Sequence, residues 1–104
     1  MTFMSMQLLD YPEGASREAL ETGGLATSRA QDFNSYAREC RPYGLRAWAQ
    51  ARDIRLYYVD NCWVRAAVTG RQVQEFIDGV LQGAVKLADG VEADKRYLLE
   101  AEEF

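Results

Sequence analysis

Two apolar segments on either side of Asp60-Asn61 constrain the fold more than any other feature of the sequence. Residues 54–59 (IRLYYV) and 62–68 (CWVRAAV) are rich in β-branched and aromatic side chains, which is typical of strands. Aspartate and asparagine both tolerate left-handed backbone, so a two-residue turn between the segments predicts an antiparallel hairpin. Thr69 to Gln72 then match a capping box, and apolar residues recur after it at three- and four-residue steps. A helix is therefore predicted to follow the hairpin and to extend to about Ala88.

The rest of the chain adds a strand near each end and helical segments before the hairpin. Ser28 to Gln31 match a second capping box, which indicates that another helix begins there. Pro42 is expected to end that helix, because proline disfavours the helical conformation of the residue before it. The expected elements are strands over 3–9 and 95–103 and helices over 16–21, 28–40 and 45–52.

This order of elements predicts a single α+β domain over residues 1–104. The length of 104 residues, with 48% hydrophobic and 27% charged residues, is typical of one globular domain. We expect a four-stranded sheet with the order β-ααα-β-β-α-β, which is a ferredoxin-like (split βαβ) variant with an enlarged first helical region. The alternative is another α+β arrangement, in which the extra helices cover both faces of the sheet.

The absence of histidine excludes several kinds of chemistry. Without it there is no Ser-His-Asp or Cys-His nucleophile, and most zinc sites are excluded as well. Cys40 and Cys62 are expected to be two buried thiols in a reducing compartment, although their sequence positions leave a disulfide open. No glycine-rich phosphate-binding motif is present. We therefore expect no cofactor and no metal, and the features favour a protein that is not an enzyme.

The charge pattern and the N-terminal residues bear on location and partners. No stretch of about 18 apolar residues occurs, and the first ten residues resemble no secretory signal, so a cytoplasmic protein is predicted. The start could lie at Met1, Met4 or Met6. The net charge is −4, which argues against nucleic-acid binding. Acidic and basic residues separate along the sequence, with an acidic excess over 1–27, a basic excess over 28–71 and an acidic excess over 72–104.

Both faces of the predicted hairpin are largely apolar. A two-residue turn places Tyr58 opposite Trp63, and Leu56 opposite Arg65, so these four side chains share one face. The other face is expected to pack against the helices, and it carries Tyr57, Val59, Cys62, Val64, Ala66 and Val68. An antiparallel sheet with helices on one face alone should be polar on the other. Something must therefore cover the face that carries Tyr58 and Trp63.

Three explanations for this second apolar face stay open. The segments over 28–40 and 45–52 could pack over it, a second copy of the chain could cover it, or another protein could dock on it. A turn one residue longer would exchange the two faces and expose Arg55 and Tyr57 instead. Glu100 and Glu102 should point the same way from the last strand. They could oppose edge-to-edge aggregation, hold a hard cation, act as acid and base, or meet a basic partner.

These features favour a non-catalytic protein–protein interaction module of bacterial or phage origin. It would mask a surface of another protein, as an inhibitor, immunity protein or adaptor does. Tyrosine, tryptophan and arginine are enriched among residues that dominate binding energy. The expected partner-binding residues are Tyr58, Trp63, Arg65 and Leu56, with electrostatic help from Glu100 and Glu102. The alternative is a dimeric small-ligand-binding or cofactor-free enzyme domain with a pocket between the sheet and the helices.

Overall fold

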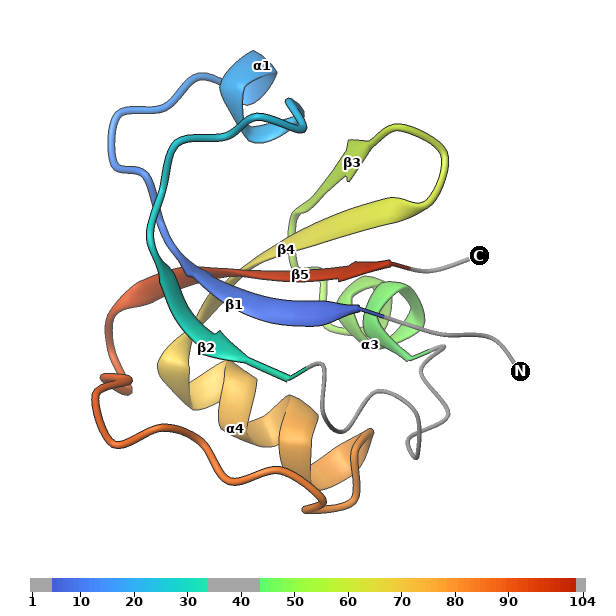
Figure 1. Ribbon diagram of the computed structural model, residues 1–104. Coiled ribbons are helices and arrows are strands. Elements are labelled where there is room, and N and C mark those ends of the chain that lie inside the picture. Colours follow the sequence, from blue (N-terminus) through green and yellow to red (C-terminus); the bar gives the residue numbers. More distant parts are fainter. Residues whose placement is uncertain (1–4, 34–43, 103–104) are drawn as a thin grey trace.

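Five strands form one antiparallel sheet in a computed structural model that describes residues 5–33 and 44–102 (Figure 1). The strand order across the sheet is β2-β1-β5-β4-β3. The elements, in chain order, are β1 (Met6–Asp10), α1 (Arg17–Leu20), β2 (Arg29–Asp32), α3 (Leu45–Ala51), β3 (Leu56–Val59), β4 (Trp63–Thr69), α4 (Gly70–Gly79) and β5 (Arg96–Glu102). The α+β class is therefore confirmed, whereas the expected number of strands is wrong.

The additional strand is β2, in the segment where the sequence predicted a helix over 28–40. Arg29–Asp32 pairs antiparallel with β1, and flanking backbone bonds from Asp10 N to Ser28 O and from Phe33 N to Met6 O extend the pairing. Gln31, which would close the capping box, bonds elsewhere: its side chain accepts from Ala88 N at 2.7 Å. Tertiary pairing overrides the local signature here. The rest of that predicted helix, including Cys40, and Pro42, which was expected to end it, lie outside the described residues.

The strand order also departs from the ferredoxin-like arrangement. β4 and β5 are antiparallel neighbours, so α4 and the loop after it return the chain beside β4 without a crossover to a parallel strand. β5 in turn pairs antiparallel with β1 and therefore lies between the first strand and the hairpin. The predicted strands at the two ends of the chain thus form the middle of the sheet.

The helix after the hairpin has the predicted start and an earlier end. Thr69 and Gln72 exchange both hydrogen bonds of the capping box, as expected. The helix ends at Gly79 and not near Ala88. Gly79 lowers helix stability, and Gln82 and Gly83 adopt positive φ angles of 53° and 73°, which are incompatible with continuation of a right-handed helix.

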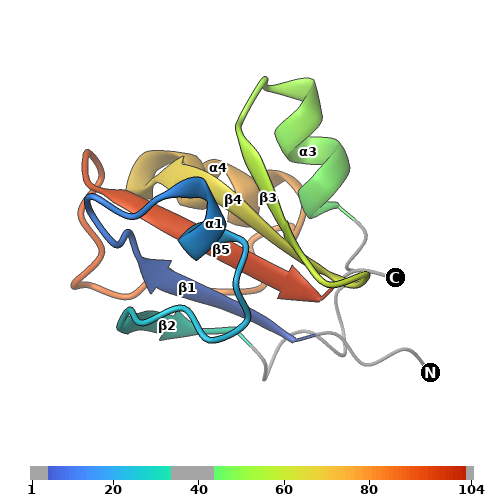
Figure 2. The same ribbon diagram turned by 90° about the horizontal axis from the view of Figure 1, so that it is seen from above.

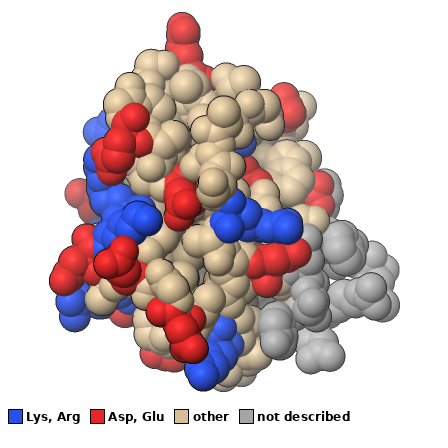
Figure 3. Space-filling view, turned by 60° about the vertical axis from the view of Figure 1, so that its left-hand side comes forward, with Lys and Arg blue, Asp and Glu red and all other residues tan. Residues whose placement is uncertain are grey.

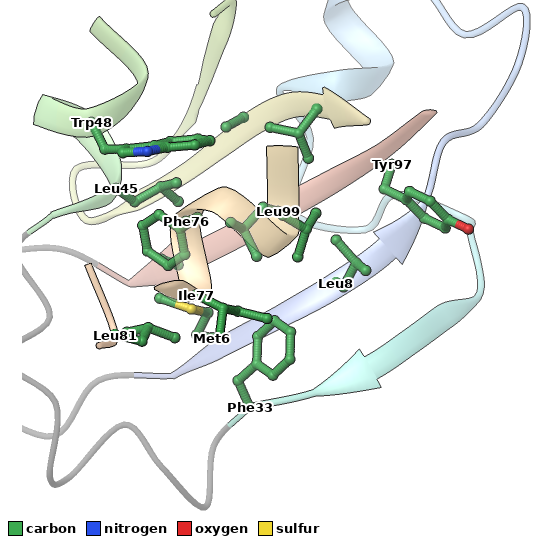
Figure 4. Close-up of a cluster of buried hydrophobic side chains, with 14 of the residues drawn as sticks. Met6, Leu8, Phe33, Leu45, Trp48, Phe76, Ile77, Leu81, Tyr97 and Leu99 are labelled. Carbon is green, nitrogen blue, oxygen red and sulfur yellow. The ribbon is translucent and has the colours of Figure 1, made fainter. Parts of the chain in front are cut away.

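One face of the sheet packs against α3 and α4, and Figure 2 shows α4 behind the sheet and α3 beside the β3 edge. Trp48 of α3 and Phe76 of α4 make an edge-to-face ring contact with centroids 5.2 Å apart. Figure 4 shows this core, to which the strands contribute Met6, Leu8, Tyr97 and Leu99. The described residues include no helix with the length and apolar character needed to cross a membrane.

The opposite face is covered in part by α1 and the loops on either side of it, which we call the 11–28 segment. Leu20 of α1 packs there with Leu9, Tyr57 and Leu98 from three strands. The second apolar face is therefore covered in part by the expected 16–21 helix and its flanking loops, so helices lie on both faces of the sheet, as in the alternative α+β arrangement. The 45–52 helix lies with the other core cluster, on the α4 side.

The hairpin turn is one residue longer than the two residues predicted. Val59 pairs with Trp63, so Asp60, Asn61 and Cys62 form the turn, and Asp60 adopts a positive φ of 55°. Tyr58 consequently pairs with Val64, and not with Trp63 as expected. Cys62 lies in the turn and not in the strand; its thiol is free and half-buried. The longer turn that stayed open as an alternative is the one observed, but only one of its two expected consequences follows: Arg55 is exposed, whereas Tyr57 is buried.

Candidate functional site

The hairpin register divides the predicted partner-binding residues between the two faces. Trp63 pairs with Glu102, and Arg65 pairs with Glu100, so these four share the face that the 11–28 segment partly covers. Tyr58 and Leu56 share the other face with Val64. The expectation that Tyr58, Leu56, Trp63 and Arg65 form a single surface is therefore wrong. The four residues of β4 and β5 do come together.

Tyr58 remains accessible on the edge strand. Its exposed fraction is 45%, which makes it the one exposed large hydrophobic side chain among the described residues. The guanidinium carbon of Arg46 in α3 lies 5.4 Å from the centroid of its ring, within cation–π range. Leu56 is half-buried.

Arg65 and Glu100 form a buried ion pair and not an exposed contact surface. Arg65 Nε donates to Glu100 Oε2 at 2.7 Å, and the two side chains are only 4% and 8% exposed. Gln7 Nε2 of β1 donates to the other carboxylate oxygen at 2.6 Å. Side chains from three adjacent strands thus form a polar row, Gln7–Glu100–Arg65, across the face that the 11–28 segment partly covers. A buried charge pair needs such additional hydrogen bonds to offset its desolvation.

Arg65 also fixes the 11–28 segment to the sheet. Its Nη1 donates to the backbone oxygens of Leu20 at 2.7 Å and Thr22 at 2.9 Å. The Leu20 carbonyl lies at the end of α1, where backbone acceptors have no partner within the helix, and the Thr22 carbonyl beyond it also accepts from Leu25 N at 3.3 Å. The remaining nitrogen of the guanidinium, Nη2, has no hydrogen-bond partner among the residues that the structure describes.

Two hollows adjoin the polar row beneath the loop that follows α1. Their volumes are about 330 and 390 Å³, and both are lined by Gln7, Gly23, Arg65 and Glu100. The first extends toward β2, where its other lining residues are Leu9, Leu25, Thr27 and Arg29. The second extends toward the hairpin turn, where they are Val59, Asp60 and Trp63. Together the hollows cross the sheet from one edge strand to the other.

Trp63 and Glu102 lie beside the second hollow and are only half-buried. Trp63 lines the hollow directly, whereas Glu102 is its cross-strand neighbour. An amphipathic indole at the mouth of a polar hollow can contact the apolar part of an incoming group. The site combines a fixed polar floor with an aromatic wall, which suits binding.

Sequence reasoning did not identify Gln7, Gly23 or Arg29 as part of this site. Gln7 was placed in the correct strand, but nothing in a single sequence indicates that it meets Glu100. Arg29 was assigned to a helix, and it lies in an edge strand instead. The one available signal was Arg65 itself: a charged residue within an apolar strand needs a buried partner of opposite charge or an exposed position.

The blocks of charge seen in the sequence do not stay separate in space. Ion pairs join them: Arg96 binds Glu13, Arg71 binds Asp94 at 2.9 Å, and Arg65 binds Glu100. Figure 3 shows acidic and basic side chains interspersed over the face that it presents. That face therefore has no extended surface of one sign.

No histidine is present in the chain, and the described residues include no group of three acidic or cysteine side chains placed to hold a metal ion. Both oxygens of Glu100 already accept hydrogen bonds from neighbouring side chains. The carboxylate therefore holds the polar row together. No family model, curated protein or solved structure matches the chain, so its site is interpreted from geometry alone.

Proposed function

We propose that this chain is a non-catalytic binding module that masks a surface of another protein, in the manner of an inhibitor, immunity protein or adaptor. The observation that carries the proposal is the half-buried Trp63 beside a hollow of about 390 Å³ with a fixed polar floor. Tryptophan at the edge of a pocket is a common anchor of protein interfaces. The partner would contact Trp63 and Glu102 and insert a side chain into the hollow.

The rigidity of the floor supports this function. Arg65 and Glu100 are held by each other, by Gln7 and by the backbone of the 11–28 segment. A floor with fixed rotamers loses little conformational entropy when a partner binds, so more of the contact energy contributes to affinity. The same side chains are poor candidates for direct interface contacts because they are almost completely buried.

The test is to capture the partner from the source cell, identify it, and measure its affinity for single variants. Trp63→Ala should weaken binding by about 2 kcal/mol or more, which is roughly thirtyfold. Tyr58→Ala is the matched control, because Tyr58 lies on the opposite face of the same hairpin. If Tyr58→Ala weakens binding and Trp63→Ala does not, the partner docks on the other face and this assignment is wrong.

A small-ligand-binding domain is the second candidate, and the volumes of the two hollows favour it. Sites for small molecules commonly enclose about 300–1,000 Å³, a range that both hollows reach. These hollows lie between the sheet and the 11–28 segment, which contains α1. Light scattering after size-exclusion chromatography tests the dimer that was expected with this function. A strict monomer would remove the dimeric part of the proposal.

A further inference from the structure

The donors of Arg65 are only partly used. A guanidinium group has five N–H donors. One, on Nε, binds Glu100, and those on Nη1 bind the carbonyls of Leu20 and Thr22. The two N–H groups of Nη2 have no acceptor within the described residues, although Arg65 is only 3% exposed. Among the described residues, Trp48 Nε1 is the one fully buried side-chain nitrogen or oxygen without a hydrogen-bond partner, so Arg65 Nη2 keeps some contact with solvent and is open to an incoming acceptor.

The hollow that extends toward β2 has the charge to receive an anion. Its lining includes two guanidinium groups, Arg29 and Arg65, and one carboxylate, Glu100, whose oxygens are both already bonded. Arg29 is 55% exposed, and its ion pair with Asp32 is long, at 3.5 Å. The hollow toward the hairpin turn differs, because its lining includes Asp60 and lacks Arg29.

We propose that the hollow beside Arg29 binds a carboxylate group, which accepts hydrogen bonds from Arg65 Nη2 and pairs with Arg29. Leu9 and Leu25, which also line this hollow, would contact the hydrocarbon part of the ligand. The carboxylate belongs either to a small organic acid or to a partner protein, as a chain terminus or an acidic side chain. This proposal rests on the proposed function only in placing binding on this face of the sheet.

The backbone amide of Gly23 provides a direct readout, because this residue lines both hollows. Its NMR signal would be followed while the full chain is titrated with sodium butyrate at constant ionic strength. Butylammonium chloride and butanamide serve as probes of the same chain length with positive and zero charge. A saturable shift with butyrate alone is the expected result. An equal shift with butanamide or butylammonium, or no saturable shift with butyrate, would overturn the proposal.

Variants then assign the binding residue. Arg29→Gln should raise the butyrate dissociation constant about two- to fivefold, as expected for a partly exposed ion pair. The matched control is Arg17→Gln, because Arg17 is exposed, is paired with Glu21 and does not line either hollow. Equal effects of the two substitutions would mean that general charge, and not this hollow, attracts the anion. Arg65→Lys, with its fold checked by near-ultraviolet circular dichroism, should abolish the Gly23 shift.

A pair of short peptides distinguishes the two sources of the carboxylate. A tetrapeptide that ends in leucine with a free C-terminus is compared with its C-terminal amide. Tighter binding of the free peptide than of butyrate indicates a protein partner, and the reverse indicates a small acid. If Trp63→Ala disrupts a captured partner while no carboxylate shifts Gly23, the function stands and this inference fails. If carboxylates bind and Trp63→Ala leaves partner binding unchanged, the reverse holds.

Discussion

Replacing Glu100 with leucine tests whether the buried polar row stabilises the fold. The substitution removes the anionic partner of a guanidinium that is 4% exposed, which leaves its charge bonded only to the neutral carbonyls of Leu20 and Thr22. Breaking a buried pair in this way costs about 3–5 kcal/mol. The free energy of unfolding of such a domain is about 5–15 kcal/mol, so the loss should be a large fraction of the total. Guanidinium chloride unfolding of the parent and variant measures it.

The double variant Arg65→Met/Glu100→Leu separates the charge from the hydrogen bonds. Without either charge, the desolvation penalty disappears, so the double variant should be more stable than either single one. It should nevertheless remain about 1–3 kcal/mol less stable than the parent, because the Leu20 carbonyl loses its donor and the Thr22 carbonyl keeps only the bond from Leu25 N. Backbone hydrogen exchange should accelerate over the 11–28 segment in the single variant Arg65→Met and in the double variant.

The exposed pair Arg71–Asp94 provides the control, because its side chains are 64% and 91% exposed. Arg71→Met should change the unfolding free energy far less than Glu100→Leu does. The reasoning is refuted if Glu100→Leu costs less than about 1 kcal/mol, the value for surface pairs, or if the effects of the two buried substitutions simply add.

Three further substitutions test local features. Gly70→Ala should destabilise the protein by about 1–3 kcal/mol in thermal unfolding, because the added Cβ would lie 2.1 Å from the Glu92 carbonyl oxygen; an unchanged melting temperature would contradict that close approach. Thr69→Ala removes the acceptor for Gln72 N and should cost about 1 kcal/mol in urea unfolding, whereas Thr69→Ser should cost much less. Burial, and secondly the neighbouring Tyr57, raises the pKa of Tyr11, so the hydroxyl of Tyr11 loses its proton at a lower pH in the unfolded chain than in the folded protein. The free energy of unfolding should therefore fall more steeply above about pH 10 in the parent than in Tyr11→Phe. Parallel plots of unfolding free energy against pH for the two proteins would contradict this.

Local signals in the sequence were sufficient where no competing contact intervened. The capping box at Thr69, the helix over 45–51 and the short helix after Ser16 all form as expected. The similar box at Ser28 does not, because β1 pairs with that segment and Gln31 bonds to the backbone of the loop after α4. The two boxes have matching residue types, so only the tertiary partners distinguish them. A single sequence does not contain that information.

The hairpin shows which part of a site survives an error in register. Residues two apart on one strand share a face whatever the turn length, so Trp63 stays with Arg65 and Glu100 stays with Glu102. The extra turn residue changes only which residues of β3 lie opposite those of β4, and it moves Tyr58 to the face that packs against α3 and α4.

The side of β4 that faces α3 and α4 carries Val64, Ala66 and Val68, which are completely or almost completely buried. Its opposite side must therefore carry Trp63 and Arg65 for any turn length. Only the burial of that side depended on a contact that the sequence did not indicate. The 11–28 segment covers the apolar side chains around Leu98 and binds Arg65, but it leaves Trp63 and Glu102 half-buried beside a hollow. The limit of that segment is therefore the boundary between the core and the proposed binding surface.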